Sequence, residues 1–225
     1  MDLHDAHEGY RSEAQDIMIV LLSNMLLGLV RLLVGARGVG HDLGRHDQSR
    51  IYFANHTSHL DTLVVLAALP GDVRRTVHPA AALDYWGSSK GKRFIAEQLL
   101  NSILIDRQRS TDADPLEPVM EVLHNKESVL IFPEGTRGHG DRIESFRSGL
   151  YNLAARFPDR DLVPVYLDNL SRIMPKGSFL VVPMICTPRF GAPIRLKRGE
   201  ERRAFLDRAR DALAELAPPR DGGAA

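Results

Sequence analysis

Hydrophobic and polar positions follow one another along the chain in the two periods of regular secondary structure. Short apolar or β-branched runs bounded by turn residues predict strands at 50–54, 74–78, 102–105, 128–132, 162–167 and, with two prolines inside, 179–190. Apolar residues at helical spacing predict helices at 60–69, 90–100, 116–126, 147–156 and 200–216. The last helix has its apolar side at Phe205, Leu206, Ala209, Leu213 and Leu216. This alternation indicates an α/β fold with a mixed, largely parallel central sheet flanked by helices.

The N-terminal forty residues differ in pattern from the rest of the chain. Residues 1–16 are polar and mostly acidic, and an apolar run follows from Ile17 to Val34. This run is about as long as a membrane-spanning helix, which needs roughly 20 residues. A helix in the plane of the membrane is our first interpretation, a single spanning anchor the second, and a helix buried in the protein's own core the third.

These patterns divide the chain into three parts. We expect a polar arm and an apolar membrane-associating helix at 1–40, one catalytic or binding domain at 41–217, and a disordered tail at 218–225.

Composition excludes several classes of function. The 29 Lys and Arg residues balance the 29 Asp and Glu residues, so no long-range field favours nucleic acid and we expect no such partner. The single cysteine, Cys186, excludes an intrachain disulfide framework and a multi-cysteine metal site. We expect neither a metal nor a cofactor.

A histidine and an aspartate follow the first buried strand, with Asp61 five residues after His56. Five positions rotate by about 140° around a helix, so the two meet only if His56 lies in a turn and Asp61 in the first helical turn. Ser58-x-x-Asp61 is a capping-box pattern, which predicts a helix start at Ser58 and allows that arrangement. The carboxylate would fix the tautomer of the imidazole, whose other nitrogen could take a proton from an alcohol. By spacing alone, a helix cap beside a turn histidine is the simpler interpretation.

A second candidate segment, Phe132-Pro133-Glu134-Gly135-Thr136-Arg137, follows the most apolar strand. Its proline ends sheet pairing, and Gly135 permits close approach of a ligand to the backbone. Arg137 and exposed amides can hold a phosphate, while Glu134 can orient Arg137 or a substrate hydroxyl. Taken alone, the segment is more simply an ordinary turn with a solvated arginine.

Taken together, these segments resemble the glycerolipid acyltransferase family of the lysophosphatidate acyltransferase type. His56-Thr57-Ser58-His59-Leu60-Asp61 resembles its His-x-x-x-x-Asp signature, and Phe132 to Arg137 matches its second signature in every residue. Asn101 to Arg107 resembles the acceptor-site block between them, and Leu162 to Val165 resembles the fourth, apolar block. The chain departs from the family at Gly138, where Ser is common, and in a middle block without the usual Gly and Phe.

The resemblance implies direct transfer of a fatty acyl group from an acyl thioester, acyl-CoA or acyl-carrier protein, to the sn-2 hydroxyl of lysophosphatidic acid. The product would be phosphatidic acid, and no acyl-enzyme would form. His56 would be the general base, and Asp61 would orient it. The residues implied in binding the glycerol phosphate of the acceptor are Arg107, Glu134, Gly135, Thr136, Arg137 and Arg147. The partners would be a membrane lipid and the acyl donor, at the cytoplasmic face of the cell membrane, with peripheral or single-span attachment.

Three other functions stay open. The acceptor could be another lysolipid, such as a lyso-ornithine lipid or another lysophospholipid. The chain could be a non-catalytic lipid-binding protein with the same fold. It could also be a hydrolase that uses Ser88, Ser89 or water, since Gly87 to Gly91 fits the nucleophile-elbow pattern. The residues before that pattern do not predict the strand that such an elbow needs.

Overall fold

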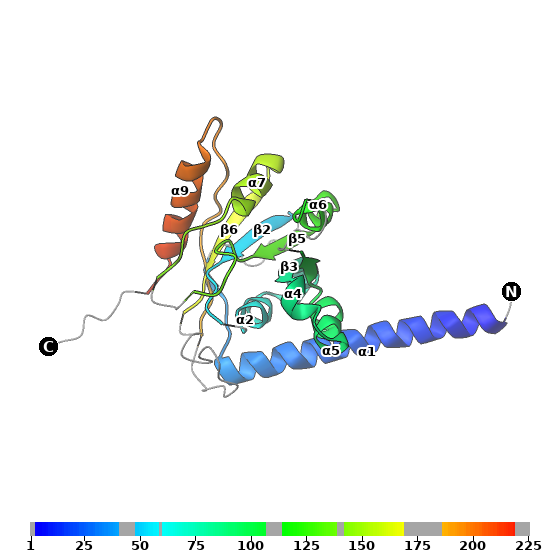
Figure 1. Cartoon of the computed structure of the whole chain (residues 1–225). Coiled ribbons are helices and arrows are strands. Elements are labelled where there is room, and N and C mark those ends of the chain that lie inside the picture. The colour runs from blue at the N-terminus through cyan, green and yellow to red at the C-terminus, as the bar shows by residue number, and fades with distance from the viewer. Residues whose placement is uncertain are drawn as a thin grey trace.

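The computed structural model describes residues 3–40, 48–58, 60–106, 114–138, 142–168 and 186–218, with side chains from Ala14 onward. Figure 1 shows a central sheet with helices on both faces and a long N-terminal helix that passes below α2 and α5 in this view. The strands are β1 (Val39–Gly40), β2 (Arg50–Ala54), β3 (Val77–Ala82), β4 (Ile103–Ile105), β5 (Ser128–Ile131), β6 (Asp161–Tyr166) and β7 (Arg189–Phe190). The helices are α1 (Leu3–Val34), α2 (Asp61–Ala68), α3 (Gly71–Arg75), α4 (Leu83–Trp86), α5 (Lys90–Phe94), the π-helix η1 (Ile95–Leu99), α6 (Glu117–His124), α7 (Gly149–Arg156) and α9 (Arg202–Ala214).

The strands form one sheet in the order β1-β7-β6-β2-β5-β3-β4. The run from β6 to β4 is parallel throughout, whereas β7 is antiparallel to β6 and parallel to β1. The predicted α/β fold with a mixed, largely parallel sheet is therefore confirmed. In such sheets the carboxyl ends of parallel strands meet at one edge, where the following loops come together.

Strand β2 lies at the centre of the sheet, and its side chains alternate between two hydrophobic layers. Ile51 and Phe53 pack in the layer covered by α6, α7 and α9, while Tyr52 and Ala54 pack in the layer covered by α1 and α2. All residues of β2 are buried, which is why this strand is apolar on both faces instead of alternating with polar residues. The predicted apolar side of the last helix is confirmed, with Phe205, Ala209 and Leu213 fully buried in α9.

The strand predicted at 74–78 is wrong in its first half. Helix α3 covers Gly71–Arg75, and β3 begins only at Val77. Helix α2 ends at Ala68, and Pro70 is the N-cap of this next, short helix. Acidic Asp72 and basic Arg74 lie at the ends of α3 that suit the helix dipole. The predicted strand at 179–190 falls largely outside the described residues, and the described part contains only the short strand β7.

Helix α1 is exposed along most of its apolar run. Leu27, Val30 and Val34 are buried in the same layer as α2, but Leu32 is 81% exposed and Met25 is 67% exposed. The stretch Ala14–Val34 has the length and composition to cross a membrane, and 17% of its apolar window is buried. The interpretation of this segment as a buried core helix is therefore wrong. The two membrane interpretations, and the division of the chain at residue 40, stay predictions.

Candidate active site

His56 and Asp61 lie in contact after the end of β2. Asp61 Oδ2 is 2.7 Å from Nδ1 of His56, and the His56 side chain is 24% exposed while that of Asp61 is fully buried. A carboxylate can only accept hydrogen bonds, so Nδ1 carries the proton. Asp61 does not contact Nε2. This second ring nitrogen is therefore the one that can accept a proton.

The loop between these two residues folds around the same carboxylate oxygen. Oδ2 of Asp61 also accepts hydrogen bonds from the backbone amides of Thr57, at 2.6 Å, and Ser58, at 3.0 Å. The predicted helix start at Ser58 is wrong, because α2 begins at Asp61 and Leu60 is its N-cap without a side-chain cap. Although α2 begins later than predicted, the carboxylate reaches back to the turn and accepts the amide hydrogen of Ser58, which is the acidic half of the predicted capping box. His56 thus lies in the turn and Asp61 in the first helical turn, as the spacing requires.

Phe132, the first residue of the second signature, holds the imidazole from one face. Its ring stacks on that of His56 with a centroid separation of 4.4 Å and an interplanar angle of 24°. Because β5 lies beside β2 in the parallel sheet, the residue after β5 comes next to the residues after β2. Stacking on Phe132 restricts rotation of the His56 imidazole, and the hydrogen bond to Asp61 fixes the edge of the imidazole that carries Nδ1.

Glu134 connects the two signatures through the backbone. Its Oε1 accepts the amide hydrogen of His56 at 2.8 Å, and its Oε2 accepts that of Glu144 at 3.2 Å. The residue is buried, and burial raises the pKa of its carboxyl above the ordinary value, although the hydrogen bonds from these two amides oppose that shift. Both oxygens are thus engaged with the chain itself. The predicted contact of Glu134 with a substrate stays a prediction.

Gly135 and Arg147 lie against each other at the edge of this site. Gly135 has φ +74°, and a Cβ there would collide with Nε and Cδ of the Arg147 side chain. Arg147 Nε donates to the backbone oxygen of Glu134 at 3.1 Å, and its amide donates to the oxygen of Pro133 at 2.8 Å. The glycine thus allows a long basic side chain to cross the turn, where it remains exposed.

Of the other residues predicted to bind the acceptor, the structure describes Thr136 and Arg137 but not Arg107. Thr136 is exposed and Arg137 is half-buried in the turn after β5, on the side of the sheet edge that carries His56. The next residue, Gly138, donates its amide to the backbone oxygen of His56 at 2.8 Å, so the turn is joined directly to the histidine. Arg107 lies outside the described residues. Their predicted roles in binding the acceptor stay predictions.

Asn55 is a site residue that the sequence interpretation missed. Its buried side chain donates from Nδ2 to the backbone oxygen of Leu167 at 2.9 Å and accepts at Oδ1 from the amide of Leu167 at 2.8 Å. These bonds join the ends of β2 and β6 directly before His56. The signal was available: a polar amide directly after a wholly buried strand needs a partner in the fold.

Ser88 and Ser89 do not form a nucleophile elbow. They follow helix α4, not a strand, and Ser89 is the N-cap of α5, where its hydroxyl accepts from the amide of Lys92 at 3.3 Å. The Ser88 hydroxyl donates to the backbone oxygen of Tyr85 at 2.8 Å. The hydroxyls of both serines make local hydrogen bonds, and both side chains are exposed. A nucleophile elbow instead places its serine directly after a strand.

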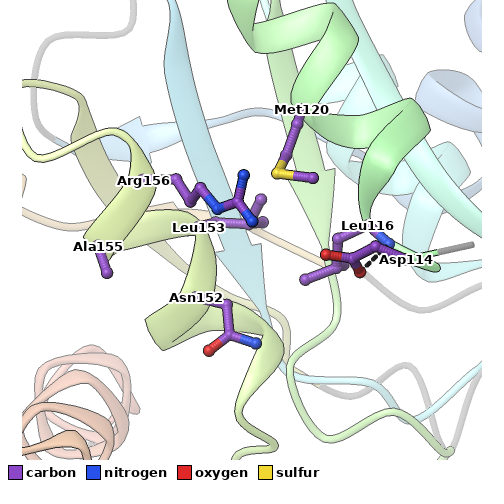
Figure 2. Close-up of a pocket in the computed structure, with 7 residues that line it drawn as sticks. All are labelled: Asp114, Leu116, Met120, Asn152, Leu153, Ala155 and Arg156. Atoms are coloured by element: carbon purple, nitrogen blue, oxygen red, sulfur yellow. Dashed lines mark hydrogen bonds between the residues drawn. The ribbon is translucent and has the colours of Figure 1, made fainter.

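A separate hollow of about 230 Å³ lies between α6 and α7. Figure 2 shows apolar Leu116, Met120 and Leu153 on its walls together with Arg156 and Asn152. None of its lining residues belongs to the His56 site. Within the described ranges, no group of three or more His, Cys, Asp or Glu residues lies close enough to hold a metal ion.

The fold brings together a fixed histidine–aspartate pair whose imidazole can accept a proton. The family model described as "Acyltransferase" matches residues 39–168, more than half of the chain, so the protein belongs to the Acyltransferase family. That range contains His56, Asp61 and the whole second signature.

Individual relatives agree with this family. The 1-acyl-sn-glycerol-3-phosphate acyltransferase alpha of Bos taurus is 30% identical over 172 residues, which cover 74% of this chain and 57% of that protein. The 1-acyl-sn-glycerol-3-phosphate acyltransferase of Cocos nucifera is 30% identical over 157 residues, covering 67% and 47%. The chain thus spans about half the length of the curated relatives it matches.

A solved structure has the same fold. The crystal structure of the 1-acyl-sn-glycerophosphate (LPA) acyltransferase PlsC from Thermotoga maritima superposes with a TM-score of 0.67 at 20% identity, covering 92% of this chain and 82% of that one. At this identity the likeness shows the fold alone.

Proposed function

We propose that this protein transfers a fatty acyl group from an acyl thioester to the sn-2 hydroxyl of lysophosphatidic acid, giving phosphatidic acid. The observation that carries the proposal is the His56–Asp61 pair, with Nδ1 held at 2.7 Å by a buried carboxylate inside the range that matches the family. The names of the relatives from Bos taurus and Cocos nucifera support this choice of acceptor.

The reaction needs one proton acceptor and no covalent enzyme intermediate. Nε2 of His56 takes the proton of the acceptor hydroxyl as its oxygen attacks the thioester carbonyl carbon. The new C–O bond forms, the C–S bond breaks, and the departing sulfur takes up the proton from the imidazolium. Asp61 stabilises the imidazolium while the ring is charged, since its carboxylate is already fixed by the amides of Thr57 and Ser58. The thioester supplies the activated acyl group, so this scheme requires no cofactor or metal.

Basic side chains around the turn after β5 are suited to the phosphate of the acceptor. Arg137 and Arg147 both belong to this turn region, and Arg147 is fixed near its Nε by the backbone oxygen of Glu134, which leaves its outer guanidinium nitrogens for a ligand. Arginine holds phosphate by paired hydrogen bonds better than lysine does. We assign acceptor binding to Arg107, Arg137 and Arg147, with Gly135 and Thr136 contributing the turn, and Glu134 supporting it through the backbone.

The enzyme would act at the cytoplasmic face of the cell membrane. The acceptor is itself an amphiphile, and the exposed apolar face of α1 fits a bilayer better than water. Both acyl-CoA and acyl-carrier protein are soluble thioesters and would approach from the cytoplasm.

A transfer assay tests this function. The purified full chain in detergent would receive labelled oleoyl-CoA or oleoyl-acyl-carrier protein with lysophosphatidic acid or with other lysolipids. We expect labelled phosphatidic acid from the wild type, a loss of about 10²–10⁴-fold in His56→Ala, and unchanged turnover in Ser89→Ala. Full transfer by His56→Ala would refute the mechanism. Preference for a different lysolipid would correct the acceptor, and product loss only in Ser89→Ala would favour a hydrolase.

A further inference from the structure

Exposed large apolar side chains are concentrated in one part of the described chain. Nine lie on α1, four lie at the α4–η1 region, and the one remaining is Val39. The four are Leu83, Tyr85, Phe94 and Ile95, each between 37% and 45% exposed. Scattered exposed apolar residues are normal in soluble proteins, whereas a concentration of them indicates a surface that is covered in the functional state. The other helices, α6, α7 and α9, have no member of this set.

The two groups of apolar residues belong to neighbouring elements. The hydroxyl of Ser23 in α1 donates to the backbone oxygen of Leu99 in η1 at 2.7 Å. Figure 1 shows α5 lying directly over the middle of α1. Helix α4 is joined to α5 by Lys92, whose ammonium lies 4.2 Å from the centre of the Tyr85 ring. We call the exposed apolar residues of α1 together with Leu83, Tyr85, Phe94 and Ile95 the apolar surface.

Several basic residues lie on the helices that carry this apolar surface or adjoin it. Lys90, Lys92 and Arg93 belong to α5, and Arg93 pairs with Glu97 at 3.0 Å. On another side, burial lowers the pKa of Arg74 below its ordinary value, and the positive charges of Arg31 and Arg75 lower it further. Arg31 of α1 and Arg75 of α3 thus both lie near Arg74. An anionic lipid surface complements an apolar surface that has basic residues beside it.

The contacts of α1 also determine how it can meet a bilayer. Asn24, the middle residue of the apolar stretch Ala14–Val34, accepts a hydrogen bond from Arg74 at 2.6 Å. If α1 crossed the membrane, the guanidinium of Arg74 and the backbone of η1 would lie near the bilayer midplane, where charge and irregular backbone are strongly disfavoured. In addition, Leu27, Val30 and Val34 pack on the domain and cannot face lipid.

We propose that α4, α5 and η1 make a second contact with the leaflet of an anionic bilayer along whose surface α1 lies with its exposed side in the acyl region. The basic residues would then lie at the level of the lipid phosphates, and the apolar side chains would enter below them. This inference rests on the proposed function only in taking a lipid bilayer as the occupant of the apolar surface.

Vesicle binding tests the second contact. The full chain would be sedimented with vesicles of phosphatidylcholine alone or with added phosphatidylglycerol. We expect tighter binding to the anionic vesicles, and the double variant Arg75→Glu/Lys90→Glu should lose about tenfold or more of that binding. Phe94→Ser/Ile95→Ser should weaken binding to both kinds of vesicle. The matched control is Arg203→Glu on α9, whose side chain is 96% exposed on the opposite side of the sheet and whose reversal should change nothing. Equal losses in Arg203→Glu, or no loss in both double variants, would overturn the second contact.

Depth measurements test the orientation of α1. Spin labels would be placed singly at Leu21→Cys, Met25→Cys and Leu32→Cys, which share the exposed side. The native Cys186 is fully buried, and burial together with the nearby Asp61 raises the pKa of its thiol to about 12, so it stays unlabelled. We expect similar depths at all three sites. A steady change in depth over the roughly 16 Å of axis between the outer labels would instead show a spanning helix.

These readouts are independent of acyl transfer. The Arg75→Glu/Lys90→Glu variant should retain wild-type turnover on lysolipid dispersed in detergent, since neither residue belongs to the His56 site. Vesicle binding as described without any transfer in the wild type would refute the proposed function and leave the bilayer contact intact. Transfer without a preference for anionic vesicles would do the reverse.

Discussion

The His56 site and the exposed apolar side of α1 differ in how their side chains are held. Around His56, a ring, a carboxylate and several backbone amides are each held by a named partner: Asp61 at 2.7 Å, Phe132 at 4.4 Å between ring centres, and Glu134 at 2.8 Å. On α1, nine large apolar side chains between Ile17 and Leu33 are exposed.

This difference agrees with the function proposed for each region. Proton transfer depends steeply on the position and tautomer of one ring, so the site requires directional hydrogen bonds. Contact with a fluid bilayer depends on apolar area and on charge near the phosphates, both of which tolerate substitution. Single substitutions should therefore have large, position-specific effects at His56 and small, additive effects on the exposed side of α1.

The largest effect is expected at Asp61. In Asp61→Asn, an amide NH₂ facing Nδ1 would favour the wrong imidazole tautomer, and turnover should fall by about 10²–10⁴-fold. Asp61→Ala should lose turnover equally and also about 2–3 kcal/mol of unfolding free energy, since the amides of Thr57 and Ser58 lose their acceptor. Steady-state kinetics and urea unfolding measure the two effects. Wild-type turnover in Asp61→Asn would mean that a specific partner for His56 is not needed.

An intermediate effect is expected within α1 itself. Leu27 is 2% exposed and packs against the domain, whereas Leu29, two residues later, is 51% exposed. Leu27→Ala should lower the unfolding free energy by about 2–4 kcal/mol, and Leu29→Ala should change it by less than about 0.5 kcal/mol. Urea unfolding of both variants in the same detergent compares them directly. Equal losses of unfolding free energy in the two variants would show that α1 has no buried side and no exposed side.

The smallest effect concerns the charge of Glu134 and depends on pH. Burial raises the pKa of this carboxyl, so the folded protein holds the proton more tightly than the unfolded chain. Its contribution to stability is present below the ordinary glutamate pKa and is lost as the pH rises through the raised value. Glu134→Gln cannot titrate, so the wild-type unfolding free energy minus that of Glu134→Gln should fall from about pH 4 to about pH 7. A difference that rises with pH would show that the amide hydrogen bonds outweigh burial.

Much of the fold was predictable because its strands are short and wholly apolar. The strand at 50–54 has the predicted bounds, and the one at 128–132 is a single residue shorter in the structure. The error at 74–78 arose because a second, short helix begins directly after Pro70, so the chain enters β3 only at Val77. The helix predicted at 90–100 divides into α5 and a π-helix, because Leu100 bonds back to Ile95.

The candidate site was predictable in its members but not in their contacts. The spacing allowed the His56–Asp61 contact, and the resemblance of the signatures to the family predicted it, although α2 begins later than Ser58. The hydrogen bond from the His56 amide to Glu134 was not predicted, since the two residues are 78 positions apart in the sequence. Asn55 was missed, and its partner Leu167 lies 112 residues away.

The amino-acid sequence by itself determined the alternation of strands and helices, the positions of the two signatures and the apolar character of α1. Each of these depends on neighbours within a few residues, where the periods of helix and strand act. Only the tertiary structure decided that Phe132 stacks on His56, that Glu134 ties the two signatures together, and that α1 has one buried and one exposed side. Those features depend on which strands become neighbours in the sheet, and that is set by packing of the whole chain.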